Sequence, residues 1–160
     1  MPTSSLPNLA EILGPVLGRI GAEQRPLVIA AAERSAATRY RGWANAVKNP
    51  TIKAGLNECA AREDDIATRV EAMYPNAGIL QEQLLELTPE LLDGGRAIFS
   101  PYSLKDQFAL QAQGERIGAA TWRSYAARAS NDQHKEIFLQ CAVLEELSAT
   151  FLESLANERL

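Results

Sequence analysis

The chain has 160 residues, 46% of them hydrophobic, which is enough for one domain to bury a core without disulfide staples. Its net charge of −4, with no basic block, argues against binding to nucleic-acid phosphates. No apolar run approaches the roughly 20 residues of a membrane span, the N-terminus lacks a secretory-signal pattern, and two cysteines give no disulfide framework. We therefore expect a single domain over residues 1–160, in the cytoplasm, with reduced thiols.

Apolar residues recur at helical spacing along most of the chain, and no segment reads as a strand. The predicted helices cover 9–20, 22–48, 50–73, 79–87 (weaker), 103–129 and 131–157, with a possible turn of helix at 89–93 followed by Gly94 and Gly95. Gly14 and Pro15 are expected to kink or split the first helix. Asn49, Ser103 and Asn131 are each placed to cap the helix that follows. The predicted fold class is all-α.

An internal repeat organises the chain. A shift of 82 residues places 33–72 on 115–154 without a gap, and thirteen of these forty positions are identical, where composition alone gives roughly three. The identical pairs are Glu33/Glu115, Arg34/Arg116, Ala37/Ala119, Arg41/Arg123, Ala44/Ala126, Asn49/Asn131, Lys53/Lys135, Cys59/Cys141, Ala60/Ala142, Glu63/Glu145, Ala67/Ala149, Thr68/Thr150 and Glu71/Glu153. The repeat predicts two helical hairpins, at about 22–73 and 103–157, joined by a long crossover over 75–102.

One glutamate lies in the apolar stripe of each long helix. Glu33 precedes Asn49 by 16 residues and Glu63 follows it by 14. At about 1.5 Å per residue, two antiparallel helices bring these carboxylates to nearly the same height. The second hairpin repeats this spacing with Glu115 and Glu145. Four carboxylates are therefore expected to converge midway along the helices.

This pattern resembles the ferritin-like superfamily, especially its rubrerythrin-type branch, over about residues 22–157. The resemblance implies an up-down four-helix bundle with one long crossover, preceded here by a short N-terminal helix. It also implies that each hairpin offers a glutamate from its first helix and Glu-x-x-His from its second, which together hold two iron ions. The residues that match the family's glutamates are Glu33, Glu63, Glu115 and Glu145. The two histidine positions hold Ile66 and Ser148, and Tyr40 falls where some members carry a tyrosine beside the metal.

Four ionised carboxylates in a core require compensation, because desolvation and like-charge repulsion both oppose them. Bound cations are one remedy, and an all-oxygen site suits Mn²⁺, Fe²⁺, Mg²⁺ or Ca²⁺ better than Zn²⁺. Protonation together with water is another. Arginine partners are a third, since four arginines recur in both copies at the edge of the stripe, where a long stem can reach inward. These are Arg34, Arg41, Arg116 and Arg123.

The other chemically notable residues are interpreted as structural. Cys59 and Cys141 face inward and are expected to act as small hydrophobic residues. His134, the single histidine, lies about 16 Å along its helix from Glu145 and is assigned to a helix end. The remaining set comprises core or interface aromatics and a solvated acidic face: Trp43, Trp122, Tyr125, Phe151, Asp64, Asp65 and Glu146.

Two functions stay open at this level, and whether the chain is an enzyme is undecided. The first is a di-metal carboxylate protein that binds iron or manganese through the four glutamates and stores iron or consumes oxygen or peroxide. The second is a non-enzymatic structural or interaction bundle that has lost the metal site and compensates its core glutamates with arginine. A homo-oligomer, a dimer in the simplest case, is the expected partner. The apolar face of residues 9–20 is expected to cover the chain's own helices or a second subunit.

Overall fold

All regular secondary structure is helical in the part of the chain that the computed structural model describes, residues 5–91, 93 and 95–160, and no strand occurs there. The prediction of an all-α protein is confirmed. The α-helices of these residues are α1 Leu9–Gly18, α2 Arg25–Ala46, α3 Pro50–Glu71, α4 Ala77–Glu86, α5 Arg96–Phe99, α6 Leu104–Ala127 and α7 Asp132–Ser154, with 3₁₀ turns η1 Pro89–Leu91 and η2 Leu155–Asn157.

Three long helices begin at the predicted capping residues. The side chain of Asn49 accepts hydrogen bonds from the backbone N–H groups of residues 51 and 52, at 2.9 and 3.3 Å. Ser103 accepts from the N–H of residue 106 at 3.2 Å, and Asn131 accepts from the N–H of His134 at 2.8 Å. Each contact satisfies a backbone donor that the first turn of a helix leaves unpaired. His134 accordingly sits at a helix end, as expected.

The structure differs from the sequence predictions at Pro15 and at the turn of residues 89–93. Pro15 lies inside α1 without splitting it. Its missing N–H removes one helical hydrogen bond, but Leu9 and Val16 are both buried on one face, which keeps the two halves on a common surface. The 3₁₀ turn at Pro89–Leu91 accounts for only the start of the turn predicted at 89–93. Gly94 lies outside the described residues.

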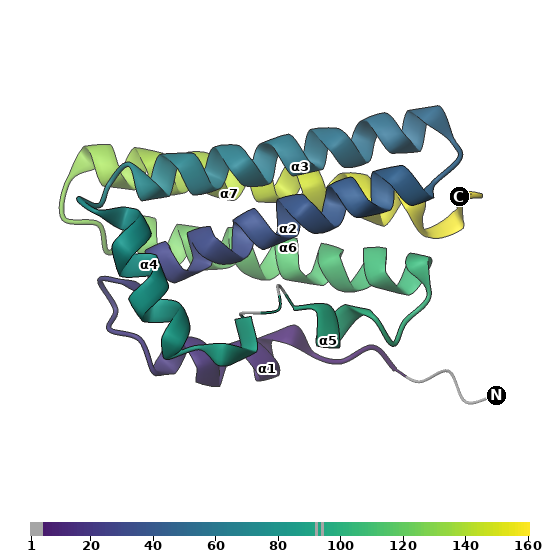
Figure 1. The fold of residues 1–160 in the computed structure, drawn as a ribbon. Helices are drawn as coiled ribbons and strands as arrows, with labels where there is room; N and C mark the ends of the chain where they lie inside the picture. Colours follow the sequence, from purple (N-terminus) through teal and green to yellow (C-terminus); the bar gives the residue numbers. More distant parts are fainter. Residues whose placement is uncertain (1–4, 92, 94) are drawn as a thin grey trace.

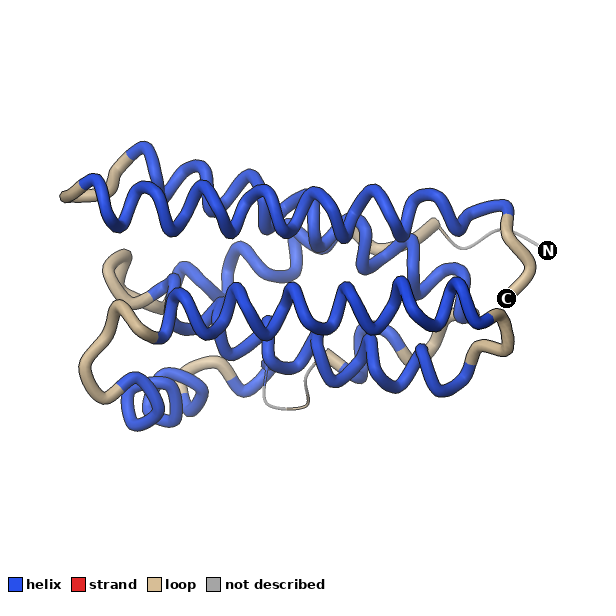
Figure 2. Tube along the Cα trace, turned by 90° about the horizontal axis from the view of Figure 1, so that it is seen from above, coloured by secondary structure: helices blue, strands red, loops and turns tan. Residues whose placement is uncertain are grey.

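The four long helices lie side by side, as Figure 1 shows. α2 packs along α3, and α6 packs along α7, each pair antiparallel and joined by a short turn. α3 also packs on α7, whereas α2 and α6 approach each other less closely. The view from above in Figure 2 shows the long helices running next to one another over most of their length.

The segment between α3 and α6 crosses the length of the molecule. It carries α4 and α5 and returns the chain to the end at which α2 finishes, so that α6 starts there (Figure 1). α4 packs on α2 and α1 packs on α6. Leu9, Val16 and Ile20 are buried by this packing, so the apolar face of residues 9–20 covers the chain's own helices. Of the helices in the described residues, none combines the length and apolar character that crossing a membrane requires.

Residues 82 positions apart make matching contacts in the two hairpins. Arg34 on α2 donates to Glu71 and to the hydroxyl of Thr68 on α3. Arg116 on α6 donates in the same way to Glu153 and Thr150 on α7. These contacts lie on the outside of each pair of helices and fix the register between its two members.

Candidate metal centre

The four core glutamates are buried where the helical spacing places them. Their exposed fractions are 8% for Glu33, 0% for Glu63, 1% for Glu115 and 1% for Glu145. Glu33, Glu63 and Glu145 each offer a carboxylate oxygen, and these three oxygens lie within 4.8 Å of one another. Glu115 adjoins this triad, since its charge raises the pKa of both Glu63 and Glu145.

The two carboxylates of the second hairpin are held by hydrogen-bond donors. The hydroxyl of Tyr40 donates to Oε1 of Glu115 at 2.6 Å, and the amide of Gln111 donates to the same oxygen at 2.8 Å. The indole N–H of Trp122 donates to Oε1 of Glu145 at 2.8 Å. Tyr40 and Trp122 are 82 residues apart, and each supplies a donor to the cluster. Such contacts fix the orientation of a carboxylate in the way that outer-shell groups do around bound metals.

Glu63 differs from these two residues. Within residues 5–91, 93 and 95–160, no hydrogen-bond donor reaches either of its oxygens, and none reaches Oε2 of Glu115. A buried carboxylate without a partner is strongly disfavoured, because it has lost its water without gaining a replacement. These three oxygens therefore require protons shared with neighbouring carboxyls or a cation between them.

The pKa values within the cluster are displaced upward. Burial, followed by the charges of Glu115 and Glu33, holds the pKa of Glu63 well above its ordinary value. Burial and the neighbouring carboxylates do the same to the pKa of Glu145. Burial also raises the pKa of Glu33, although the adjacent carboxyl of Glu63 opposes the effect. Without a cation, these upward shifts favour the protonated forms of Glu33, Glu63 and Glu145.

The prediction that the four repeated arginines compensate this cluster is wrong. Each one turns outward and forms an ion pair with an acidic side chain that remains in contact with water. The pairs are Arg34 with Asp64 and Glu71, Arg41 with Asp64, Arg116 with Glu153, and Arg123 with Glu146. An arginine at the edge of the stripe keeps its hydration in this arrangement, whereas an inward pair would have to be desolvated.

A different arginine approaches the cluster. Arg39 is half-buried, its guanidinium lies 4.0 Å from the centre of the Phe99 ring, and its Nε donates to Gln111 at 3.1 Å. Its charge lowers the pKa of Glu33, but this is the smallest of the effects on that pKa. Burial in turn lowers the pKa of Arg39 itself.

The two positions at which the resemblance calls for histidine hold no imidazole. Ile66 is fully buried among apolar side chains. Ser148 accepts a hydrogen bond at 2.9 Å from Arg62, which also contacts the sulfur of Cys59 at 3.3 Å. Burial raises the pKa of Cys59, and it raises the pKa of Cys141 to about 12, so both stay thiols at neutral pH. Their predicted role as small buried residues agrees with this state.

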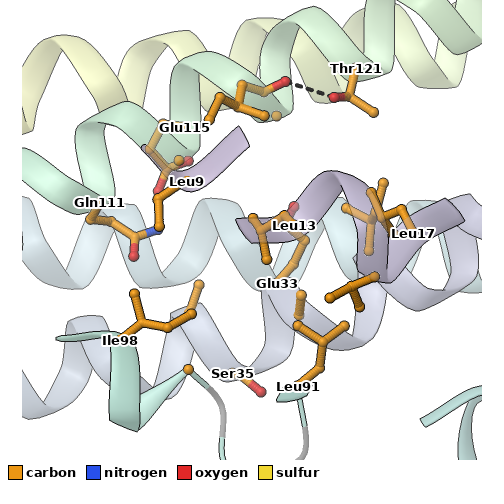
Figure 3. A pocket seen from close by; sticks show the side chains of 18 of the residues that line it. Leu9, Leu13, Leu17, Glu33, Ser35, Leu91, Ile98, Gln111, Glu115 and Thr121 are labelled. Atoms are coloured by element: carbon orange, nitrogen blue, oxygen red, sulfur yellow. Dashed lines mark hydrogen bonds between the residues drawn. The ribbon is translucent and has the colours of Figure 1, made fainter. Parts of the chain in front are cut away.

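A cavity of about 330 Å³ reaches the cluster from one side. α1, α2 and α6 contribute most of its wall, and Glu33, Glu115 and Glu145 border it (Figure 3). Gly118 of α6 lies where the carboxyl of Glu145 approaches the helix, because a Cβ atom at this position would stand 2.5 Å from Oε1 of Glu145. The absence of a side chain at Gly118 thus allows Glu145 to occupy its place in the triad.

Three residues that contact or approach the glutamate cluster are not predicted by the sequence analysis. Gln111 lies one helical turn before Glu115, and a polar residue on that apolar stripe was a usable signal. Trp122 was assigned to the core without a donor role, because its partner lies on another helix. Arg39 gave no signal, since its approach depends on how α2, α5 and α6 meet.

Comparison of the chain with protein-family models, with curated proteins and with solved structures finds no match. Three carboxylates that converge on one point form a hard-oxygen donor set, which divalent cations such as Mn²⁺, Fe²⁺, Mg²⁺ and Ca²⁺ favour.

Proposed function

We propose that this chain is a ferritin-like four-helix bundle of two repeated hairpins whose core glutamates bind a divalent metal ion, iron or manganese. One observation carries the proposal. Glu63 is fully buried with both oxygens unpartnered among the described residues, and it points into the space that it shares with Glu33 and Glu145. A cation there would remove the desolvation and repulsion that otherwise oppose three neighbouring carboxylates.

The residues present fit such an ion. Glu33, Glu63 and Glu145 would hold it, and Glu115, outside this triad, leaves one oxygen without a donor among the described residues. The missing imidazoles at Ile66 and Ser148 leave an all-carboxylate set, which favours iron or manganese over zinc. A bound iron ion would supply storage capacity or redox chemistry with oxygen or peroxide.

The assignment to a ferritin-like bundle is supported by two features of the helices. Two antiparallel helical pairs are joined by one crossover that runs the length of the molecule (Figure 1). Each pair carries one buried glutamate on each helix, with equal spacing about Asn49 and Asn131. The outer contacts of Arg34 and Arg116 repeat as well. Duplication of one hairpin accounts for all of these features.

Calorimetric titration with Mn²⁺, and with Fe²⁺ under anaerobic conditions, tests the proposal. We expect saturable binding to the wild-type chain and a loss of about hundredfold or more in affinity for Glu63→Gln, which removes a ligand charge at constant shape. Glu58→Gln is the matched control, because Glu58 lies on the same helix but faces solvent. No binding to the wild-type chain, or equal binding by both variants, would refute the proposal.

A structural bundle without metal is the second candidate, and the raised pKa values favour it. A raised pKa favours the protonated form of Glu33, Glu63 and Glu145, and protonated carboxyls can share their protons, so the cluster can persist in the absence of a cation. This candidate predicts that Mn²⁺ leaves the melting temperature unchanged. A ligand that binds only the folded chain must raise it, so a specific increase with Mn²⁺ would exclude the metal-free candidate.

A further inference from the structure

The cavity beside the glutamate cluster is mostly apolar. Outside the cluster its wall carries the hydroxyls of Ser35 and Thr121, and each of these donates to a backbone carbonyl of its own helix. Figure 3 shows Leu9, Leu13 and Leu17 of α1 along one wall, with Ile98 and Leu91 opposite them. The volume of about 330 Å³ falls within the range of sites that hold small organic ligands. An apolar wall of this kind gives a polar molecule no hydrogen-bond partners in exchange for its water.

Small residues on the two facing helices create this space. Ala32 and Ala36 of α2 line the cavity, as do Gly114 and Gly118 of α6. Ala32 and Gly114 are 82 residues apart, and so are Ala36 and Gly118, so both copies of the hairpin present the same small face. α1 closes over that face, and a Cβ atom at Gly114 would stand 3.4 Å from the side chain of Leu9.

The polar end of the cavity is the glutamate cluster itself. Glu33, Glu115 and Glu145 border the cavity, whereas Glu63 does not. Glu33 is the most exposed of the four core glutamates, at 8%. Arg39 and Gln111 also border this end, and they bond to each other. A molecule in the cavity would therefore contact apolar side chains along its length and carboxylates at one tip.

We infer that the cavity binds an uncharged aliphatic molecule of about twelve carbon atoms whose end lies against Glu33 and Glu115. The size follows from volume, since a cavity of about 150 Å³ lined by apolar side chains binds benzene and this one is about twice as large. The absence of charge follows from the groups at this tip, where the carboxylates repel an anion and the guanidinium of Arg39 repels a cation. If the proposed metal site is correct, this molecule is positioned as the substrate of that site, so that part of the inference rests on the proposed function.

Calorimetry with primary alcohols of six to fourteen carbons tests the inference on the full chain without added metal. We expect affinity to rise about fourfold per methylene and to level off near twelve carbons, where the cavity is full. Ala32→Leu fills part of the cavity and should weaken dodecanol binding by about tenfold or more. The matched control is Ala46→Leu, at an exposed position on the same helix, which should bind dodecanol as the wild type does.

A second variant keeps the test decisive if Ala32→Leu folds poorly, as judged by circular dichroism. Leu13→Ala enlarges the cavity and should move the plateau towards longer alcohols. No alcohol binding by the wild-type chain, or identical chain-length profiles for all four proteins, would overturn the inference. Decanoate that binds at least as tightly as decanol would overturn the assignment of an uncharged ligand.

The two proposals fail separately. Glu63 does not border the cavity, so Glu63→Gln should weaken Mn²⁺ binding about hundredfold or more and leave dodecanol binding unchanged. Ala32→Leu should do the reverse, because Ala32 offers no ligand atom. Loss of both activities in either variant would contradict the separation of the two sites.

Discussion

The two helical hairpins place their glutamates alike but satisfy them differently. In the second hairpin, Glu115 accepts from Tyr40 and Gln111, and Glu145 accepts from the indole of Trp122. In the first hairpin, Glu63 has no donor within the described residues. Glu33 there borders the cavity, and the nearby carboxyls of Glu63 and Glu145 affect its pKa.

The carboxylates of the second hairpin are oriented by hydrogen-bond donors, whereas that of Glu63 needs a proton or a cation. Neutral donors fix the carboxylates of the second hairpin in place, whereas the carboxylate of Glu63 is left with a requirement that only a proton or a cation meets. An interior that already satisfied all four glutamates would have no use for an ion. We therefore expect the first hairpin to respond most strongly to changes in metal and charge.

The largest effect should be the loss of Mn²⁺ affinity when Glu33 and Glu115, the equivalent glutamates of the two hairpins, are replaced separately. Glu33→Gln removes a member of the triad, and Mn²⁺ affinity should fall about hundredfold. Glu115→Gln removes a carboxylate outside the triad, one of whose oxygens is already held by Tyr40 and Gln111, so the loss should be nearer tenfold. Calorimetric titration measures both. Equal losses would show that the hairpins contribute symmetrically and would remove the distinction drawn above.

The metal-free protein should become more stable when both glutamates are replaced. Pairing with the repeated arginines would have made Glu33→Gln/Glu115→Gln destabilising, but those arginines face outward. The double change relieves like-charge repulsion in a buried cluster, and glutamine still accepts from Tyr40. We expect an increase of about 1–3 kcal/mol in the free energy of unfolding, measured with urea in the presence of a chelator. A decrease of similar size would show that a buried cation such as Arg39 depends on these carboxylates.

A methyl group at Gly118 should disturb the second hairpin specifically. The added Cβ would overlap the carboxyl of Glu145, which is the free end of a flexible side chain and can move. We expect Gly118→Ala to fold and to lose about tenfold in Mn²⁺ affinity. Gly42→Ala is the control, because nothing lies within 4 Å of a Cβ atom there. If both variants bind Mn²⁺ as the wild type does, the position of Glu145 does not matter for the site.

The smallest effect is expected from the arginine–glutamate ion pair that occurs at the equivalent place in each hairpin. Arg34 and Arg116 form equivalent ion pairs in contact with water, and such pairs contribute little. Arg34→Ala and Arg116→Ala should each lower the free energy of unfolding by about 0.5 kcal/mol, without altering Mn²⁺ affinity. Chemical denaturation and titration check both expectations. A large loss of metal affinity in either variant would mean that these arginines influence the cluster after all.

Much of the fold was predictable because its signals are local. The 3.6-residue periodicity and the capping residues Asn49, Ser103 and Asn131 marked the starts of three long helices, and all three caps form. Pro15 does not split α1, since the cost of one missing hydrogen bond is set against packing that the local pattern does not reveal. Predicted helix ends fell up to a few residues beyond the observed ones, as at Ala46 and Glu71.

The sequence by itself determined that the chain is helical and that Glu33, Glu63 and Glu145 meet at one level, because rise and angle per residue are fixed in a helix. Tertiary structure alone decided how each carboxylate is satisfied. Long flexible side chains choose among partners on other helices, and the choice follows the cost of desolvation. That cost directs Arg34 outward to Glu71. It leaves Glu63 without a donor among the described residues. The cavity has the same origin, since small residues yield space only when the helices that carry them are set face to face.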